Sequence, residues 1–352
     1  MLRVALLSLM VVLTACGGDR LEATPEEAAV SSDAGTTPVQ ETTLPPPVVA
    51  PPPPPKPKRG PPYPVVFVHG MAGFDALRIG GVSMDYFGDT VQDLSARGEE
   101  VYRVVLPPFD SSSERANVLN EKLTEILERT NAEKLNLVAH SQGGIDARFV
   151  ISPAGLARGD VVATLVTVST PHRGTRVANV ATGISDGMPE YVSERVFEGL
   201  AGLLSTSVYE VERDPHLRAQ LSQLTEATMA DFNRTYVNDP RVRYLSWAGR
   251  SNLHTGLSVC DDGVRQNQPW KVDVLLPLFS GVVVATEWGL PPDISDGLVT
   301  VKSAKWGTFM GCIPADHLDE VGMPNVNGAD LSVFDSKQFF RDVVSELRTH
   351  GH

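Results

Sequence analysis

The sequence lacks several features that would assign a protein to a class directly. It has three cysteines, and none stands in a Cys-x-x-Cys pair, so the sequence does not favour a zinc site. Lysine and arginine form no cluster beyond residues 56–59 and the formal net charge is −13, which excludes nucleic acid as a partner. The N-terminal apolar run, residues 4–13, is shorter than the ~20 residues of a transmembrane helix.

The bulk composition suits a folded, soluble type of domain. Hydrophobic residues make up 42% and charged residues 21% of the 352 residues, as in ordinary globular proteins. A single large core with appendages is the simplest organisation for this length.

The N-terminus has the pattern of a secretory signal at residues 1–15. Arg3 precedes the apolar run, and Leu13-Thr14-Ala15-Cys16 resembles the lipobox of bacterial lipoproteins. The resemblance implies that Cys16 becomes the lipidated N-terminus. A diacylglyceryl cysteine that is acylated again on its amine would anchor the protein stably to a membrane. We therefore expect an extracytoplasmic protein anchored to the outer membrane or cell surface.

Residues 16–62 cannot form a packed core. Eleven of the 18 residues from Pro45 to Pro62 are proline, which favours extended polyproline II of about 3.1 Å per residue. This predicts a disordered to semi-rigid stalk, roughly 55 Å long in its proline-rich part.

Residues 63–352 read as an α/β domain. Apolar strand patterns occur at residues 64–68, 100–106, 135–139, 161–168 and 242–248, and a helical stripe occupies residues 113–130 with Ser113 as its expected N-cap. This alternation predicts a mostly parallel central sheet with helices on both faces. Residues 174–238 look helical, and we interpret them as a lid insertion.

The strongest local signal is AHSQG at residues 139–143, between an apolar strand and a helix. This is the context of a nucleophile elbow, in which small residues allow a tight turn that exposes the serine. Ala139 replaces the usual first glycine and is small enough for the turn. Ser141 is therefore the expected nucleophile.

A serine nucleophile needs a histidine base and an acid that orients it, in the chain order Ser, acid, His for this fold. His317 follows every candidate strand, whereas His172 comes too early. Asp296, at a loop-to-strand site, is the preferred acid, with Asp293 and Asp316 as rivals. The backbone N–H groups of Met71 and Gln142 are the expected oxyanion donors.

With Cys16 assigned to lipid, two cysteines remain. In an oxidising compartment, Cys260 and Cys312 most economically form one disulfide.

Several segments resemble the bacterial true lipases of the Pseudomonas and Burkholderia type. The similar segments start with YPVVFVHGMAGFD from Tyr63, include STPHRG from Ser169, and end with DGLV from Asp296 and HLDEV from His317. The resemblance spans residues 63–321, in order. It implies an α/β-hydrolase with a mobile lid that acts on water-insoluble acylglycerols, and it leaves dependence on a dedicated foldase open.

The same resemblance implies a structural calcium ion. Asp319 matches one carboxylate ligand, and Asp261 is the preferred second ligand, with Asp262 close behind. Carboxylates suit a hard, oxygen-preferring cation.

The expected activity is hydrolysis of carboxylic esters, most specifically of triacylglycerols. A polyester depolymerase or a phospholipase would use the same triad, so both remain alternatives. A catalytically dead surface-binding lipoprotein is a third alternative, and it is disfavoured because Ser141, Asp296 and His317 are all retained.

Overall fold

The computed structural model describes one folded unit, which runs from Lys56 to His352. Within this unit the described residues are 57–71, 73, 77–79, 82–84, 86–184, 189–204, 215–250, 295–323 and 334–352. Cys16, Cys260, Asp261, Asp262 and Asp293 lie outside them.

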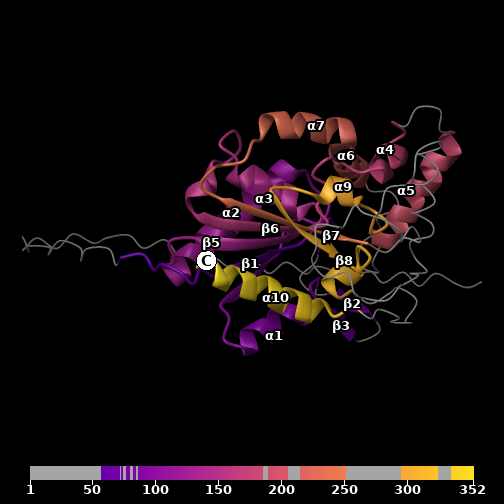
Figure 1. Cartoon of the computed structure of the whole chain (residues 1–352). Helices are drawn as coiled ribbons and strands as arrows, with labels where there is room; N and C mark the ends of the chain where they lie inside the picture. The colour runs from indigo at the N-terminus through magenta and orange to yellow at the C-terminus, as the bar shows by residue number, and fades with distance from the viewer. Residues whose placement is uncertain are drawn as a thin grey trace, which may run out of the picture. The chain divides into compact units, whose positions relative to one another are not determined.

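The centre of the unit is a six-stranded sheet in which every neighbouring pair is parallel (Figure 1). In sheet order the strands are β4 (Val101–Val104), β1 (Val65–Val68), β5 (Leu135–His140), β6 (Val162–Val168), β7 (Arg243–Gly249) and β8 (Thr308–Ile313). The five strand patterns expected from the sequence all form strands. The expected parallel α/β architecture is confirmed.

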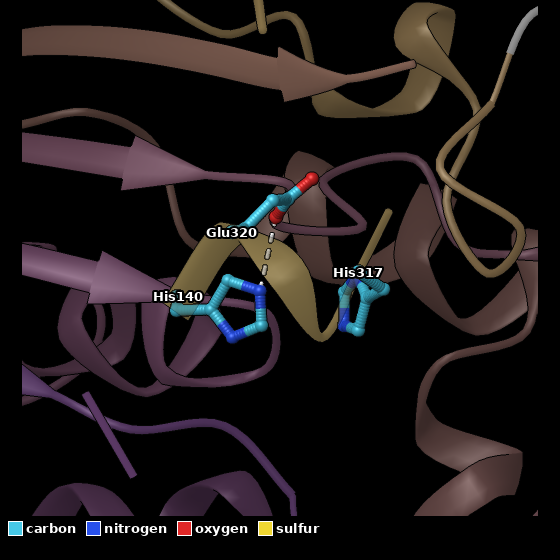
Figure 2. Close-up of side chains that lie close together, drawn as sticks. All are labelled: His140, His317 and Glu320. Carbon is cyan, nitrogen blue, oxygen red and sulfur yellow. Dashed lines mark hydrogen bonds and ion pairs between the residues drawn. The ribbon is translucent and has the colours of Figure 1, made fainter. Parts of the chain in front are cut away.

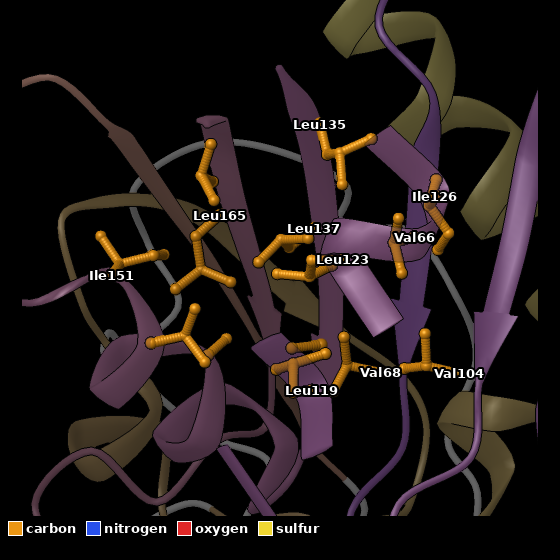
Figure 3. Close-up of a cluster of buried hydrophobic side chains, with 14 of the residues drawn as sticks. Val66, Val68, Val104, Leu119, Leu123, Ile126, Leu135, Leu137, Ile151 and Leu165 are labelled. Carbon is orange, nitrogen blue, oxygen red and sulfur yellow. The ribbon is translucent and has the colours of Figure 1, made fainter. Parts of the chain in front are cut away.

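Side chains on alternate positions of each strand enter two separate cores. Val66 and Val68 of β1 pack with Leu119 and Leu123 of helix α2 (Ser112–Thr130), on the face shown in Figure 3. Val65 and Phe67 face the other core, which holds the apolar side of helix α10 (Ser336–Thr349). Figure 1 shows α2 and α3 on one face of the sheet, with α1 and α10 on the other.

Two local features differ from the expectations. The N-cap of α2 is Ser111, whose hydroxyl accepts the N–H of Glu114, and not Ser113, which already lies within the helix. Arg59, which falls within the expected proline-rich stalk, forms a parallel bridge with Ala132. Its N–H donates to Asn131 O at 2.7 Å and its carbonyl accepts the N–H of Glu133 at 2.8 Å, so the folded unit begins before Tyr63.

The sequence patterns missed strand β8 and a small hairpin. The hairpin pairs β2 (Leu77–Ile79) with β3 (Val82–Met84). Strand β8 is hard to recognise because Thr308 at its start is exposed and Gly311 interrupts its apolar run. Without β8, the edge beyond β7 would lack its hydrogen-bonding partner.

Helices occupy the described part of the expected insertion at residues 174–238. They are α4 (Arg176–Ala181), α5 (Glu190–Leu204), α6 (Pro215–Gln223) and α7 (Glu226–Thr235). The first three share a small apolar core that includes Val180, Phe197 and Leu217. We call α4, α5 and α6 the helical cap.

The remaining elements are short or connect the strands: α1 (Thr90–Ala96), α3 (Gly143–Ile151), η1 (Arg158–Asp160), α9 (Val301–Ala304) and η3 (Asp319–Val321). Among the described residues, no helix combines the length and the apolar character needed to cross a bilayer.

Candidate active site

Ser141 occupies a sharp turn between strand β5 and helix α3. Its φ of 55° lies in the left-handed region, which a residue with a side chain adopts only when its surroundings enforce it. The N–H of Ser141 donates to Val168 O on the neighbouring strand β6 at 3.0 Å, and within the turn the N–H of Gly144 donates to Ser141 O at 3.1 Å. A Cβ on Gly143 would lie 2.6 Å from His69 O, so this position requires glycine. The sequence therefore folds here into the expected elbow.

The structure brings Ser141, His317 and Asp296 together in one hydrogen-bonded series. The Nε2 atom of His317 lies 2.9 Å from the Oγ atom of Ser141. Its Nδ1 atom lies 2.7 Å from Oδ2 of Asp296. Because an ionised carboxylate only accepts, Nδ1 carries the proton and Nε2 is left to accept from the serine hydroxyl. This is the protonation pattern that a general base requires.

Backbone donors hold the Asp296 carboxylate in place. Its Oδ1 atom accepts the N–H groups of Leu298 at 2.8 Å and Val299 at 2.7 Å. The expected strand after this residue is wrong: Ser295 and Thr300 form an isolated bridge around a turn, and helix α9 follows. A turn serves better here than a strand because its successive N–H groups converge on one carboxylate.

The alternative candidates for the acid and the base that the structure describes do not take part in the triad. The Oδ1 atom of Asp316 accepts the N–H groups of Leu318 and Asp319, and so shapes the turn that carries His317. Asp293 lies outside the described residues. His172 is buried beside Arg148, and burial together with that guanidinium lowers the pKa of His172 well below its usual range.

Gln142 and Met71, the residues expected to supply the oxyanion donors, lie near Ser141 in the chain or through Gly70. Gln142 stands directly before helix α3, where backbone N–H groups are free of helical partners. Met71 follows Gly70, and a Cβ on Gly70 would lie 2.7 Å from the Ser141 Cβ. The backbone that leads to Met71 therefore passes against the nucleophile, and only glycine permits that approach.

Arg115 holds this loop, and sequence reasoning did not single it out. Its Nη2 atom donates to the carbonyls of His69 at 2.9 Å and Gly70 at 3.1 Å. Its Nε atom pairs with Asp146 at 2.8 Å, and both side chains are fully buried. Arg115 lies four residues before Leu119 on the buried stripe of α2. A charged residue on an apolar stripe was the available signal.

His69 ties the same loop to the neighbouring strand end. Its Nε2 atom accepts the N–H of Leu106 at 2.9 Å, and its Nδ1 atom lies 2.8 Å from Gly70 O. Burial and the charge of Arg115 lower the pKa of His69 to about 3. The ring is therefore neutral and serves as a structural acceptor.

A second buried series includes His140 and Glu320, which lie close to His317 of the triad (Figure 2). The Nε2 atom of His140 lies 3.0 Å from Glu320, and its Nδ1 atom lies 2.7 Å from the phenol of Tyr86. Glu320 also accepts the hydroxyl of Ser169 at 2.6 Å. Burial and the nearby charge of Asp296 raise the pKa of Glu320 well above its usual range.

His140, His317 and Glu320 lie close enough together to resemble a metal site. However, both ring nitrogens of His317 are already used by Asp296 and Ser141. This cluster therefore shares His317 with the triad, and it does not match the calcium ligands expected from the sequence.

An apolar cavity opens onto Ser141 and His317. It encloses about 850 Å³ with its open mouth included. The helical cap supplies one wall, with lining residues Val177, Ala178, Leu200 and Leu221. In the part of the chain that the structure describes, no lysine, arginine, aspartate or glutamate lines the cavity. The site is therefore built for an uncharged, apolar group next to the nucleophile.

Two further expected sites are described only in part. Asp319 is buried at the start of η3, while Asp261 and Asp262 lie outside the described residues. Cys312, on β8, is disulfide-bonded, and its expected partner Cys260 also lies outside. The pairing and the calcium site therefore stay predictions.

The amino-acid sequence is similar to those of known proteins. The family model described as palmitoyl protein thioesterase matches residues 64–245. A triacylglycerol lipase of Vibrio cholerae is 32% identical over 216 residues, which cover 56% of this chain and 66% of that protein. A triacylglycerol lipase of Burkholderia plantarii is 28% identical over 323 residues, which cover 82% of this chain and 84% of that protein.

Solved structures agree on the fold. The mature form of the Bacillus licheniformis lipase BlEst2 superposes with a TM-score of 0.54 at 21% identity, covering 83% of this chain and 94% of that chain. Together with the parallel sheet, this confirms the expected architecture, and the relatives confirm the resemblance to bacterial lipases. The chain therefore belongs to the palmitoyl protein thioesterase family, and it is an ester-hydrolysing enzyme of the lipase type with the α/β-hydrolase fold.

Proposed function

We propose that this chain is a triacylglycerol lipase that acts through an acyl-enzyme on Ser141. The observation that carries the proposal is the series Ser141, His317 and Asp296, with spacings of 2.9 and 2.7 Å, at the mouth of an apolar cavity. The substrate is supported by relatives that are named triacylglycerol lipases.

In the first half-reaction, His317 Nε2 takes the proton of the Ser141 hydroxyl as Oγ attacks the ester carbonyl carbon. The carbonyl oxygen becomes an oxyanion, which the N–H groups of Met71 and Gln142 stabilise. The tetrahedral intermediate then collapses, His317 gives its proton to the departing alcohol, and the acyl group remains on Ser141.

In the second half-reaction, water replaces the alcohol. His317 takes a proton from the water as its oxygen attacks the acyl carbon, and the same proton returns to Ser141 Oγ as the carboxylic acid leaves. Asp296 stays ionised throughout and stabilises the imidazolium that forms twice in each cycle.

The lining of the cavity favours neutral acyl esters over phospholipids. A phospholipase must accommodate a charged phosphate close to the reacting ester, and a cation that would recognise it is missing among the described lining residues. A polyester depolymerase and a thioesterase would use the same chemistry on different leaving groups.

Substrate profiling tests the proposal. Purified protein should hydrolyse p-nitrophenyl esters from C2 to C16 and emulsified triacylglycerols, and Ser141→Ala should abolish both activities. Release of fatty acid from phospholipid vesicles, or of hydroxyacid from a short polyester, at rates above those on triacylglycerol would replace the proposed substrate by that alternative. Full activity of Ser141→Ala would contradict the mechanism.

The N-terminus is proposed to anchor the enzyme outside the cytoplasm. The support is the signal-like run followed by Cys16 and the proline-rich segment. Metabolic labelling with a fatty-acid analogue should mark the wild type but not Cys16→Ser, and equal labelling of both would contradict the anchor. A dedicated foldase remains a proposed partner, and the yield of active enzyme expressed alone tests the need for it.

Calcium is proposed to be held by Asp319 and Asp261. Asp319 is buried two residues after His317, so an ion there would fix the loop that carries the base. The two carboxylates fit a hard cation that prefers oxygen. The ion would supply structural support only. Excess EDTA should lower the melting temperature, calcium should restore it better than magnesium, and an unchanged melting curve of metal-loaded protein in EDTA would contradict the site.

The proposed Cys260–Cys312 bridge is supported by the disulfide-bonded state of Cys312. Thiol labelling of the denatured, unreduced mature protein should find no free thiol, and two labelled thiols would contradict the bridge.

A further inference from the structure

Helix α6 contacts the site through two neighbouring side chains of different character. Leu221 lines the apolar cavity next to Ser141. Gln220, one residue earlier, is 1% exposed and donates from Nε2 to the side-chain Oε1 of Gln142 at 2.8 Å. The same helix therefore forms part of the acyl pocket and also contacts the residue that supplies an oxyanion donor.

The side chain of Gln142 is held from both ends. While its Oε1 accepts from Gln220, its Nε2 donates to the Ser112 hydroxyl at 3.2 Å. The backbone of Gln142 follows directly on Ser141, whose φ of 55° is strained. A strained conformation persists only where several neighbours enforce it. Locking the next side chain is one such restraint.

We propose that α6 couples binding of the acyl chain to the oxyanion side of the site, with Gln220 acting as a positioning residue for Gln142. This inference rests on the proposed function. An acyl chain packed against Leu221 fixes the position of α6 against the site. In this position the helix keeps the hydrogen bond from Gln220 to Gln142. Binding energy from a remote part of the substrate thereby supports the transition state.

The coupling predicts a dependence on chain length that simple destabilisation does not. In wild type a long acyl chain packs against Leu221 and so favours the position of α6 in which Gln220 bonds to Gln142, whereas a short ester touches little of the cavity wall. In Gln220→Met this bond cannot form, so a long ester loses the benefit of the coupling and a short ester has little to lose. The rate loss should therefore be larger for long substrates than for short ones.

The test compares kcat and KM of wild type and Gln220→Met on p-nitrophenyl acetate and p-nitrophenyl decanoate. We expect kcat to fall about tenfold on the decanoate, equivalent to one neutral hydrogen bond of about 1.4 kcal/mol. On the acetate we expect a loss of about twofold or less, with KM for both esters little changed. An equal loss on both esters, or no loss on either, would overturn the proposal.

The matched control is Gln223→Met, one turn further along α6. Gln223 accepts the N–H of Ser112 at 3.0 Å, so this change also removes one hydrogen bond from the helix, but not the bond to Gln142. It should lower kcat on both esters by the same small factor. The same chain-length signature in this control would assign the effect to general loosening of α6, against the proposal.

Two further variants test the coupling independently of Gln220→Met alone. If Gln220→Met does not fold, Gln142→Met breaks the same bond from the other side and keeps the backbone N–H, so it should show the same dependence on chain length, with an added loss on both esters because the bond to Ser112 is removed as well. The double variant should be no worse than Gln142→Met alone, because the bond that Gln220→Met removes is already absent there. A wild type inactive on every ester would overturn the proposed function, whereas an active wild type with additive variants would overturn the coupling alone.

Discussion

Two regions of the molecule are stabilised in different ways: the strand ends, which carry the triad, and the helical cap. At the strand ends, buried polar groups are joined by short hydrogen bonds and by the buried pair of Arg115 and Asp146. The cap holds itself together with leucine, valine and phenylalanine side chains. Directional contacts fix atoms in one geometry, whereas apolar contacts tolerate exchange. Chemistry is therefore expected to depend on the first region and substrate preference on the second.

The largest expected effect comes from breaking the triad without changing its shape. Asp296→Asn keeps the size of the side chain but can no longer stabilise a protonated His317. We expect kcat to fall by about 10³ to 10⁴, with the melting temperature nearly unchanged. Ester hydrolysis and thermal unfolding measure the two quantities. A kcat within tenfold of the wild type would show that another group supplies the acid.

The next effect concerns stability at the strand ends. Asp146→Asn leaves the buried Arg115 guanidinium without its counter-charge, and breaking such a pair costs about 3–5 kcal/mol. Urea unfolding should show this loss. Asp93→Asn, which breaks the partly exposed pair with Arg341, is the control and should show a clearly smaller loss. Equal losses would mean that Arg115 is not held as the structure indicates.

A smaller and selective effect is expected from the cap. Leu221→Ala enlarges the cavity, so kcat/KM on long-chain esters should change relative to short-chain ones by about 10- to 100-fold, the range of lost apolar contacts. Leu217→Ala is the matched control because Leu217 belongs to the cap core but does not line the cavity. It should destabilise the protein while keeping the chain-length profile. Identical profiles for the two variants would contradict the assigned acyl pocket.

The smallest effect is a pH dependence of stability. Burial lowers the folded-state pKa of His69 to about 3, and that of His172 also lies well below its usual value. As the pH falls, these histidines are therefore protonated in the unfolded chain before they are protonated in the folded protein. Their contribution to the free energy of unfolding is complete above about pH 6.5 and is lost as the pH falls, by at most about 1.4 kcal/mol per pH unit for each histidine.

Asp146 acts in the opposite direction. Burial raises its pKa to about 6, so the folded state takes up this proton first and gains some stability on acidification between about pH 6 and pH 4. Urea unfolding from pH 7.5 to pH 5 should still show a net decline, with a shallower slope for His172→Gln. A flat wild-type profile would contradict neutral buried histidines.

The two regions also differ in how far the sequence predicts them. The strands and the chain order of Ser141, Asp296 and His317 could be predicted because apolar periodicity and the elbow turn are local properties. Arg115 and Gln220 could not be assigned, because their roles depend on which distant backbone or side chain lies opposite. Strand β8 was missed because its alternation is weak, and it becomes a strand only by pairing with β7.

The most direct test of the central claim is covalent capture of the nucleophile. An alkyl fluorophosphonate, incubated with wild type and with His317→Ala, should modify Ser141 of the wild type, as read by mass spectrometry of its peptides. In His317→Ala the rate of modification should fall by several orders of magnitude, because the serine loses its base. Modification of a different residue, or equal rates in both proteins, would contradict the account.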